Sequence, residues 1–90
     1  MDLQKEIANC FPEIEKLFTQ KELFYFKKTA KAALSLYHFS LGLWIRNNLL
    51  NRKKRLVKMF NEVNVYDADD MSHWIIEEFH TWIIIKYAKI

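Results

Sequence analysis

The sequence predicts an all-α protein, a compact bundle of four to five helices around a central apolar helix. One glycine and one proline occur in 90 residues, so the chain has few sites for the tight turns and left-handed corners that β-sheet folds use freely. Apolar residues recur at three- and four-residue spacing, the pattern of helices with one buried face. A chain of this length holds one hydrophobic core, so residues 1–90 are expected to form a single domain.

The N-terminal third of the chain carries three short helical patterns. A first helix is expected over Asp2–Phe11. A second begins at Pro12, because proline suits the first turn of a helix. Thr19 and Glu22 have the spacing of a capping box, in which each side chain accepts a hydrogen bond from the other residue's free backbone N–H. A third helix is therefore expected to start there and to run through Phe26.

The segment Ala30–Leu49 is apolar on nearly every side, and a helix of this kind belongs at the centre of a bundle. Its exception is a polar stripe at helical spacing, formed by Ser35, His38, Gly42 and Arg46. A basic amphipathic helix is expected over Arg52–Val63. The last helix is expected to begin at an acidic cap, Asp67, and to run to about Tyr87, with acids in its first turn where the helix dipole favours them.

Charge is distributed unevenly along the chain. The net charge is +3, yet no acidic residue lies between Glu22 and Glu62. That interval carries nine Lys and Arg residues, whereas the remainder carries eleven acidic residues and five Lys. Two interpretations are open: the acidic ends fold over the basic middle and neutralise it, or the middle meets an anionic partner.

The basic segment 46–58 contains a dense run of cations that could contact phosphates. Its members at the start of the predicted basic helix are Arg52, Lys53, Lys54, Arg55 and Lys58. Cations at a helix N-terminus are unfavourable unless an anion is near. Neither a helix-turn-helix spacing nor an RNA-binding strand motif accompanies them. An accessory protein that contacts RNA or DNA is thus an alternative function, and a solvated helix face is the plainer interpretation.

One run of residues resembles a known family. The run Leu36–Asn48 reads LYHFSLGLWIRNN and is followed by Asp69-Asp70-Met71-Ser72. It resembles a family of small bacterial domains of unknown function with an H-F-x-L-G-x-W-I-R-N core and a later D-D-x-S. The chain departs from that pattern in its basic run, where a short loop with an aromatic residue would be expected. The resemblance implies a helical fold and no particular activity.

The polar residues of these motifs are the group with the most chemistry in it: His38, Gly42, Arg46, Asp69, Asp70 and Glu78. A small enzyme could use His38 as a general base and Arg46 to clamp an anion. No nucleophile with a neighbouring base and no glycine-rich phosphate loop accompanies them, so this function is the least favoured.

The favoured interpretation of the same group is structural. Gly42 would let a neighbouring helix approach closely. The central and last helices would pack antiparallel, which brings Arg46 to Asp69 or Asp70, and His38 would then lie level with Glu78. No metal or cofactor is expected, although the i,i+4 pair His73 and Glu77 could hold zinc with a third ligand from elsewhere.

The last helix has more apolar width than one interface requires. Ile76, Ile83 and Ile84 are therefore expected to form a partner or dimer surface, unless the N-terminal helices cover them. The single cysteine, Cys10, cannot form a disulfide within the chain. The apolar C-terminal stretch is interrupted by charges, so no membrane span is expected.

The function expected from these features is that of a non-catalytic interaction protein, which regulates or inhibits a larger protein or nucleoprotein by direct binding. Phage-type inhibitors of nuclease defence, such as anti-CRISPR proteins, are an analogy based on small size, many aromatic residues and the lack of an evident active site. A homodimer is a further alternative. The N-terminus lacks the pattern of a signal peptide, so a cytoplasmic location is expected.

Overall fold

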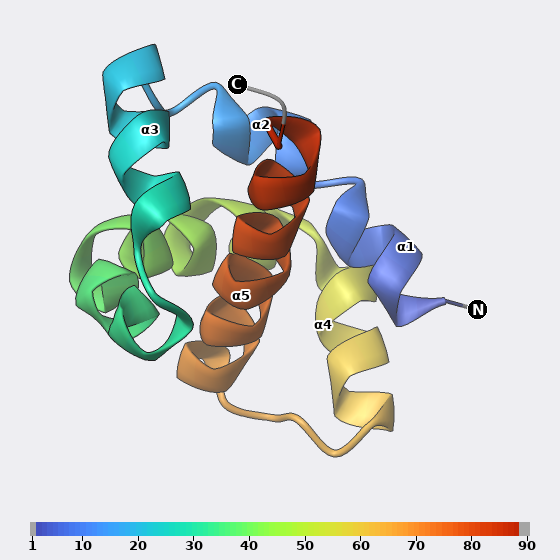
Figure 1. Ribbon diagram of the computed structural model, residues 1–90. Helices are drawn as coiled ribbons and strands as arrows, with labels where there is room; N and C mark the ends of the chain where they lie inside the picture. Colours follow the sequence, from blue (N-terminus) through green and yellow to red (C-terminus); the bar gives the residue numbers. More distant parts are fainter. Residues whose placement is uncertain (1, 89–90) are drawn as a thin grey trace.

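The computed structural model describes residues 2–88, and all of their regular elements are helical (Figure 1). The predicted all-α class is confirmed. In chain order the elements are α1 (Leu3–Ala8), α2 (Phe11–Glu15), α3 (Gln20–Lys28), η1 (Lys31–Tyr37), η2 (His38–Gly42), η3 (Ile45–Leu50), α4 (Lys54–Glu62) and α5 (Ala68–Lys86).

Local capping explains where several helices begin and end. The capping box predicted at α3 is present, because the Glu22 backbone N donates to Thr19 Oγ1 at 3.1 Å and the Thr19 backbone N donates to Glu22 Oε1 at 2.8 Å. Asp67 caps α5 by accepting from the Asp69 backbone N at 2.9 Å. Beyond the end of α4, Asn64 adopts a left-handed φ of 67°, a conformation that asparagine tolerates better than most residues.

The helix at the centre of the structure is α5, with 19 residues. It contacts α1, α3 and all three η segments, and in Figure 1 it runs between α3 and the η segments on one side and α1 and α4 on the other. Its buried residues come from several faces and are Met71, Ser72, Ile75, Ile76, Phe79, His80 and Ile83. The prediction that the segment 30–49 occupies the centre is therefore wrong.

The segment 31–50 also differs from the regular α-helix that its pattern predicts. It is a 3₁₀ helix in η1 and a π-helix in η2 and η3. Because 3₁₀ turns are tighter and π turns wider than α turns, its side chains depart from the positions that a 3.6-residue period assigns. Leu36 and Phe39 are 78% and 82% exposed, so one apolar side of this segment faces outward.

The segment nevertheless passes α5 in the predicted antiparallel sense. Near its start, Lys31 Nζ donates to Glu77 O at 2.8 Å and to Thr81 Oγ1 at 2.6 Å. Near its end, Arg46 Nη1 donates to Ser72 Oγ at 3.1 Å. Positions later in the segment therefore meet positions earlier in α5.

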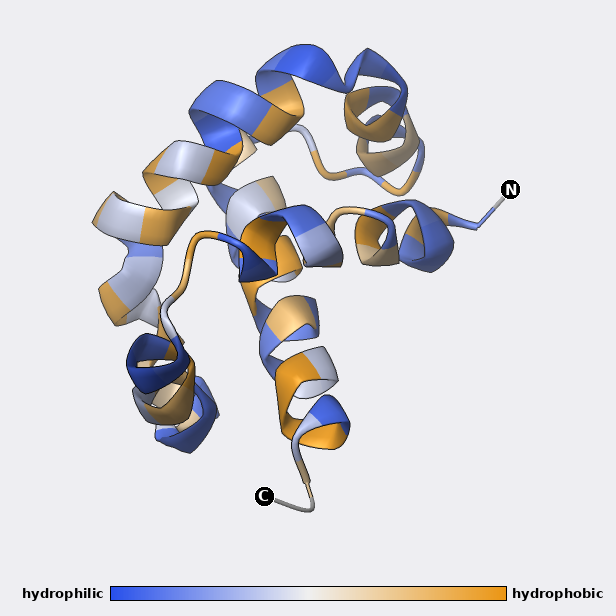
Figure 2. Ribbon diagram, turned by 90° about the horizontal axis from the view of Figure 1, so that it is seen from above, coloured by the Kyte–Doolittle hydropathy of each residue, from blue (hydrophilic) through white to orange (hydrophobic). Residues whose placement is uncertain are grey.

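The core is rich in aromatic rings that meet around Phe26. This residue is fully buried, and its ring centroid lies 5.2 Å from that of Phe18, 4.9 Å from Tyr37 and 5.4 Å from Phe79. Hydrophobic and hydrophilic residues are interleaved along the helices (Figure 2), so each helix contributes one part of its surface to this core.

Acidic residues from the N-terminal helices meet basic residues from the rest of the chain. Arg52 Nη2 lies 2.5 Å from Glu13 Oε2, and Lys86 Nζ lies 2.7 Å from Glu15 Oε1. Tyr87 Oη also donates to Glu15. Burial would raise the pKa of Glu15, but the hydrogen bonds from Lys86 and Tyr87 outweigh it and hold that pKa below its ordinary value. Among these contacts, the pair of Arg52 with Glu13 joins an acidic end of the chain to the basic middle, so the first of the two interpretations holds for part of the middle.

His80 is a buried residue of the core. The residue is 2% exposed, and neither ring nitrogen has a hydrogen-bond partner within residues 2–88. Its ring packs edge-on against Phe26 at a centroid distance of 5.1 Å. Burial, reinforced by the charge of Lys31, lowers the pKa of His80 below its ordinary value of 6.5, and backbone groups of residues 26, 27 and 29 offset only part of this effect. The folded state therefore favours neutral imidazole.

This burial predicts a pH dependence of stability. Below pH about 6.5 the unfolded chain binds a proton at His80 that the folded chain does not, so the free energy of unfolding should fall by up to about 1.4 kcal/mol per pH unit until the folded pKa is reached. Urea unfolding of the wild type and His80→Leu between pH 7 and 5 measures this slope. His80→Leu should have a shallower slope than the wild type. The control His73→Gln, at a half-exposed position, should keep the wild-type slope. Equal slopes for the wild type and His80→Leu would contradict the assignment of the pH dependence to His80.

Candidate partner-binding surface

Arg46 is the centre of a polar cluster between η3 and the start of α5. Its side chain is 15% exposed, and Nε lies 3.4 Å from Asp69 Oδ1. Nη1 donates to Ser72 Oγ at 3.1 Å and Nη2 donates to His38 O at 3.3 Å. The planar guanidinium thus joins the backbone of η2 to two side chains of the first turns of α5. We refer to Arg46, His38, Gly42, Asp69 and Ser72 as the Arg46 cluster.

Gly42 provides the space that the guanidinium occupies. A Cβ atom at this position would lie 3.0 Å from Arg46 Nη1 and 3.7 Å from Ser72 Oγ. We expected Gly42 to let a neighbouring helix approach closely, but the group closest to it is the Arg46 side chain. Sequence reasoning did not select Ser72, which is fully buried and donates to Asp69 O at 3.0 Å. The signal was available in the D-D-x-S motif, whose first and last residues both contact Arg46.

Two residues expected in the cluster lie outside it. Asp70 is exposed, and its neighbour Asp69 is the acid that reaches Arg46. Glu78 Oε1 accepts from Gln4 Nε2 at 3.2 Å, and the predicted pairing of His38 with Glu78 is wrong. His38 Nε2 instead lies 4.0 Å from Asp69 Oδ2, because the 3₁₀ and π turns place His38 level with the start of α5.

The Arg46 cluster connects elements of the fold to one another. The Ser72 hydroxyl accepts one hydrogen bond and donates another, and it is buried away from any substrate. His73 Nε2 lies 3.5 Å from Glu77 Oε2, but no group of three or more His, Cys, Asp or Glu side chains with the geometry to hold a metal ion occurs within residues 2–88. The hydrogen bonds of Arg46 and Ser72 favour a role in positioning η2 and η3 on α5.

The basic run is divided between internal contacts and solvent. Arg52 pairs with Glu13, and Arg55 Nη2 lies 3.8 Å from Glu6 Oε1. Lys53 is half-buried, whereas Lys54 and Lys58 are exposed on α4. The run therefore does not form one free cationic patch.

The predicted partner surface on α5 is largely interior. Ile76 is 1% exposed and Ile83 is fully buried, so neither can contact a partner, and this prediction is wrong for both. Ile84 is 36% exposed. The reason is the alternative left open from the sequence, since α1 and α3 pack against α5 and take up its additional apolar width.

Three exposed apolar residues instead lie close together along the chain, in η1, in η2 and directly after η2. Leu36, Phe39 and Leu43 are 78%, 82% and 47% exposed and recur at steps of three and four residues. We call these three residues the apolar stripe. The sequence contained its signal, because a segment that is apolar all round must expose one side if it is not fully enclosed.

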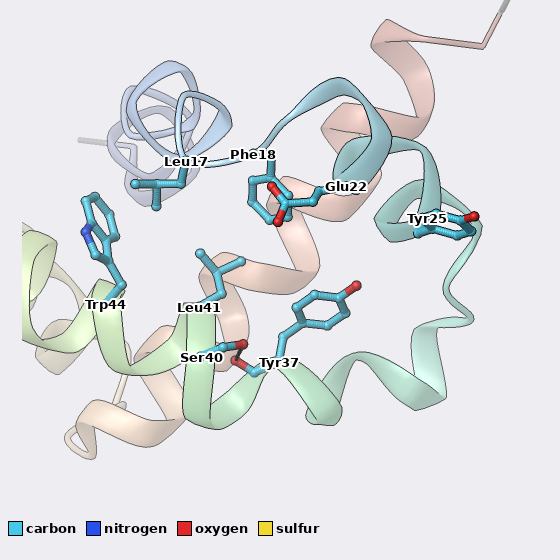
Figure 3. A pocket seen from close by; sticks show the side chains of 8 residues that line it. All are labelled: Leu17, Phe18, Glu22, Tyr25, Tyr37, Ser40, Leu41 and Trp44. Atoms are coloured by element: carbon cyan, nitrogen blue, oxygen red, sulfur yellow. Dashed lines mark hydrogen bonds between the residues drawn. The ribbon is translucent and has the colours of Figure 1, made fainter.

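A hollow with aromatic walls adjoins the stripe on the same segment. It has a volume of about 460 Å³, and Figure 3 shows the side chains around it. They come from the loop after α2, from α3 and from the segment 37–44, and are Leu17, Phe18, Glu22, Tyr25, Tyr37, Ser40, Leu41 and Trp44. We call this feature the aromatic hollow. Sequence reasoning missed it, because its residues share no spacing and meet only in the folded chain.

Among residues 2–88, no helix is both long and apolar enough to cross a membrane.

The geometry of the Arg46 cluster predicts a measurable loss of stability on truncation. Arg46→Ala removes the charged group that donates hydrogen bonds to Ser72 and to the His38 carbonyl. A hydrogen bond to a charged group contributes about 1.5–3 kcal/mol at most. The free energy of unfolding should fall by about 1–3 kcal/mol, measured by urea denaturation. Lys58→Ala, at an exposed position, should change it by less than about 0.5 kcal/mol; a similarly small effect of Arg46→Ala would contradict the bracing role.

Comparison with known proteins places these features in one family. A search of the curated proteins finds no match to the chain. A search of the solved structures finds none either. A family model described as a domain of unknown function, DUF6794, matches residues 5–83, a span that contains the Arg46 cluster, the apolar stripe and the aromatic hollow. The membership in a family of small domains of unknown function that the sequence motifs predicted is confirmed: the chain belongs to the DUF6794 family.

Proposed function

We propose that this chain is a non-catalytic interaction protein that regulates or inhibits a larger protein by binding it through the apolar stripe. The observation that carries the proposal is the exposure of Leu36 and Phe39, at 78% and 82%. A single exposed apolar side chain is ordinary on a protein surface. Three within one short segment favour a patch of the kind that marks contact sites.

The stripe is held in a defined position, as a binding surface requires. Phe39 packs edge-on against His38 with centroids 4.8 Å apart, and the Arg46 side chain bonds the His38 carbonyl. Aromatic residues that are fixed before binding lose little conformational entropy when a partner covers them, and they are frequent among the residues that dominate interface energies. π-Helical turns are rare and are frequent at functional sites, and Phe39 lies in one, η2.

Support for a non-catalytic role comes from the use of the polar residues. Arg46, Ser72 and Asp69 bond one another, which argues against an enzyme built on His38 and Arg46. The specific form of regulation that we put forward is inhibition of a cytoplasmic nucleoprotein of nuclease defence, as by anti-CRISPR proteins. It has the support of analogy in size and aromatic content.

RNA or DNA contact through the segment 46–58 is the second candidate function. Lys54 and Lys58 are four residues apart on α4 and both are exposed, which favours it. The pairing of Arg52 with Glu13 and of Arg55 with Glu6 weakens it, because those two cations already meet carboxylates.

Substitution in the stripe should abolish partner binding without unfolding the protein. Phe39→Ser and Leu43→Ser together should reduce capture of the partner from native lysate at least about tenfold, because interface anchors of this type contribute 2 kcal/mol or more. The matched control is Ile85→Ser, which alters another apolar side chain that is 70% exposed and should leave capture unchanged. Both variants should keep the wild-type melting temperature within a few degrees.

Other outcomes of the same measurement would replace the proposal. If Lys54→Gln with Lys58→Gln abolishes capture, and wild-type capture weakens steeply with salt, nucleic acid is the partner. If wild-type chain sediments as a dimer and the Phe39 and Leu43 substitutions convert it to a monomer, the stripe joins two copies of this chain. Equal capture by wild type and the stripe variant would remove the stripe from the binding surface.

A further inference from the structure

We infer that the aromatic hollow is a binding site for a small organic cation with an alkylated ammonium head. This inference concerns a site beside the apolar stripe and does not depend on the proposed protein partner. It is drawn from the chemistry of the lining, from the rigidity of the walls and from the size of the space.

The lining combines aromatic rings with a single charge of negative sign. Among the lining residues, Phe18, Tyr25, Tyr37 and Trp44 are aromatic and Glu22 carries the only charge. The faces of such rings attract cations, with Trp the strongest and Tyr and Phe next, and rings of this kind are the usual environment for alkylated ammonium groups. The Glu22 carboxylate would repel an anion, and a purely apolar ligand would gain no electrostatic attraction from it.

The Glu22 carboxylate is held at the hollow by the helix cap. Its Oε1 accepts from the Thr19 backbone N at 2.8 Å, while the Glu22 backbone N donates to Thr19 Oγ1. The capping box uses only one carboxylate oxygen, and within residues 2–88 the second oxygen accepts no hydrogen bond, so it can face a ligand. In the view of Figure 3 the carboxylate overlaps the Phe18 ring, with Tyr37 below and Tyr25 to one side.

Two walls are fixed from behind by the core. Phe26 is fully buried and contacts the rings of both Phe18 and Tyr37, at centroid distances of 5.2 and 4.9 Å. Leu41, only 6% exposed, forms part of the floor. Tyr37 stands where η1 passes into η2, with φ −88° and ψ 2°, in the sparsely populated region where binding-site residues are often found. Walls that are rigid before binding lower the entropic cost of binding.

The size of the hollow suits a small molecule. Its volume of about 460 Å³ lies within the roughly 300–1,000 Å³ of ligand sites. Leu17 and Tyr25, 43% and 59% exposed, stand at the rim, so a ligand can enter without movement of the core.

Choline and its uncharged isostere 3,3-dimethylbutan-1-ol are the probes, because they share a shape and differ in charge. Titration is followed in ¹H–¹⁵N NMR spectra by the Trp44 indole N–H, assigned through its loss in Trp44→Phe, while the indoles of Trp74 and Trp82 serve as internal references. Choline should shift the Trp44 signal saturably. A few cation–ring contacts together correspond to a dissociation constant of the order of millimolar or tighter. The neutral isostere should bind at least about fivefold more weakly.

Glu22→Gln is the decisive variant, because glutamine can replace glutamate in a capping box and removes only the charge. It should weaken choline binding about fivefold or more, with an unchanged melting temperature. Glu62→Gln, which neutralises an exposed acid on α4, is the matched control and should bind choline as the wild type does. Tyr37→Phe, which keeps the ring, should also retain binding.

Three results would overturn the inference. The first is that choline produces no saturable shift of the Trp44 indole. The second is that choline binds no better than its isostere, as in a merely apolar hollow. The third is that choline binds Glu22→Gln as well as the wild type. Each can occur whether or not the stripe captures a protein partner, so failure here and failure of the proposed function are distinguishable.

Discussion

The packing of Phe26 against α5 is the contact on which most of the structure depends. Phe26 comes from α3, yet its ring meets Phe79 and His80 of α5, Phe18 of the preceding loop and Tyr37 of η1. Burial of one phenylalanine contributes about 1.5–3 kcal/mol, a large part of the net stability of a small domain. Here the same ring also sets the positions of Phe18 and Tyr37, so the core of the domain and the walls of the aromatic hollow are one packing unit.

The charge pairs have a different role from the aromatic core. Exposed ion pairs such as Arg52 with Glu13 contribute only about 0–1 kcal/mol, so they do not hold the fold together. They bring acids from α1 and α2 onto a segment that has none of its own, which lowers the repulsion among its cations. Arg46 is the exception, because its side chain is only 15% exposed and three of its nitrogens have partners. It fixes where η2 and η3 lie against α5.

Burial within α5 and exposure along the segment 31–50 are two results of the same packing. The N-terminal helices cover Ile76 and Ile83, whereas no described element covers Leu36 and Phe39. The apolar stripe therefore lies on the segment 31–50, whereas the exposed large apolar residues of α5 are Ile84 and Ile85, near its end. The aromatic hollow opens beside it, so protein binding at the stripe and cation binding in the hollow would involve adjoining faces of one segment.

The sequence by itself determined the helical class, the capping box at Thr19 and the acidic cap of α5, because each depends on neighbours in the chain. It also predicted that Arg46 meets Asp69 or Asp70, because the two helices were expected to pack antiparallel. Only the tertiary structure decided that α5 is central, that Ile76 and Ile83 are interior, and that His38 lies level with Asp69. Periodicity describes which sides of a helix are apolar, but it does not say which side another helix will cover. It also assumes turns of 3.6 residues, and the 3₁₀ and π turns of η1–η3 change the register. The aromatic hollow lies beyond sequence reasoning for the same reason, since Phe18, Glu22 and Trp44 become neighbours only when α3 and the segment 37–44 pack around Phe26.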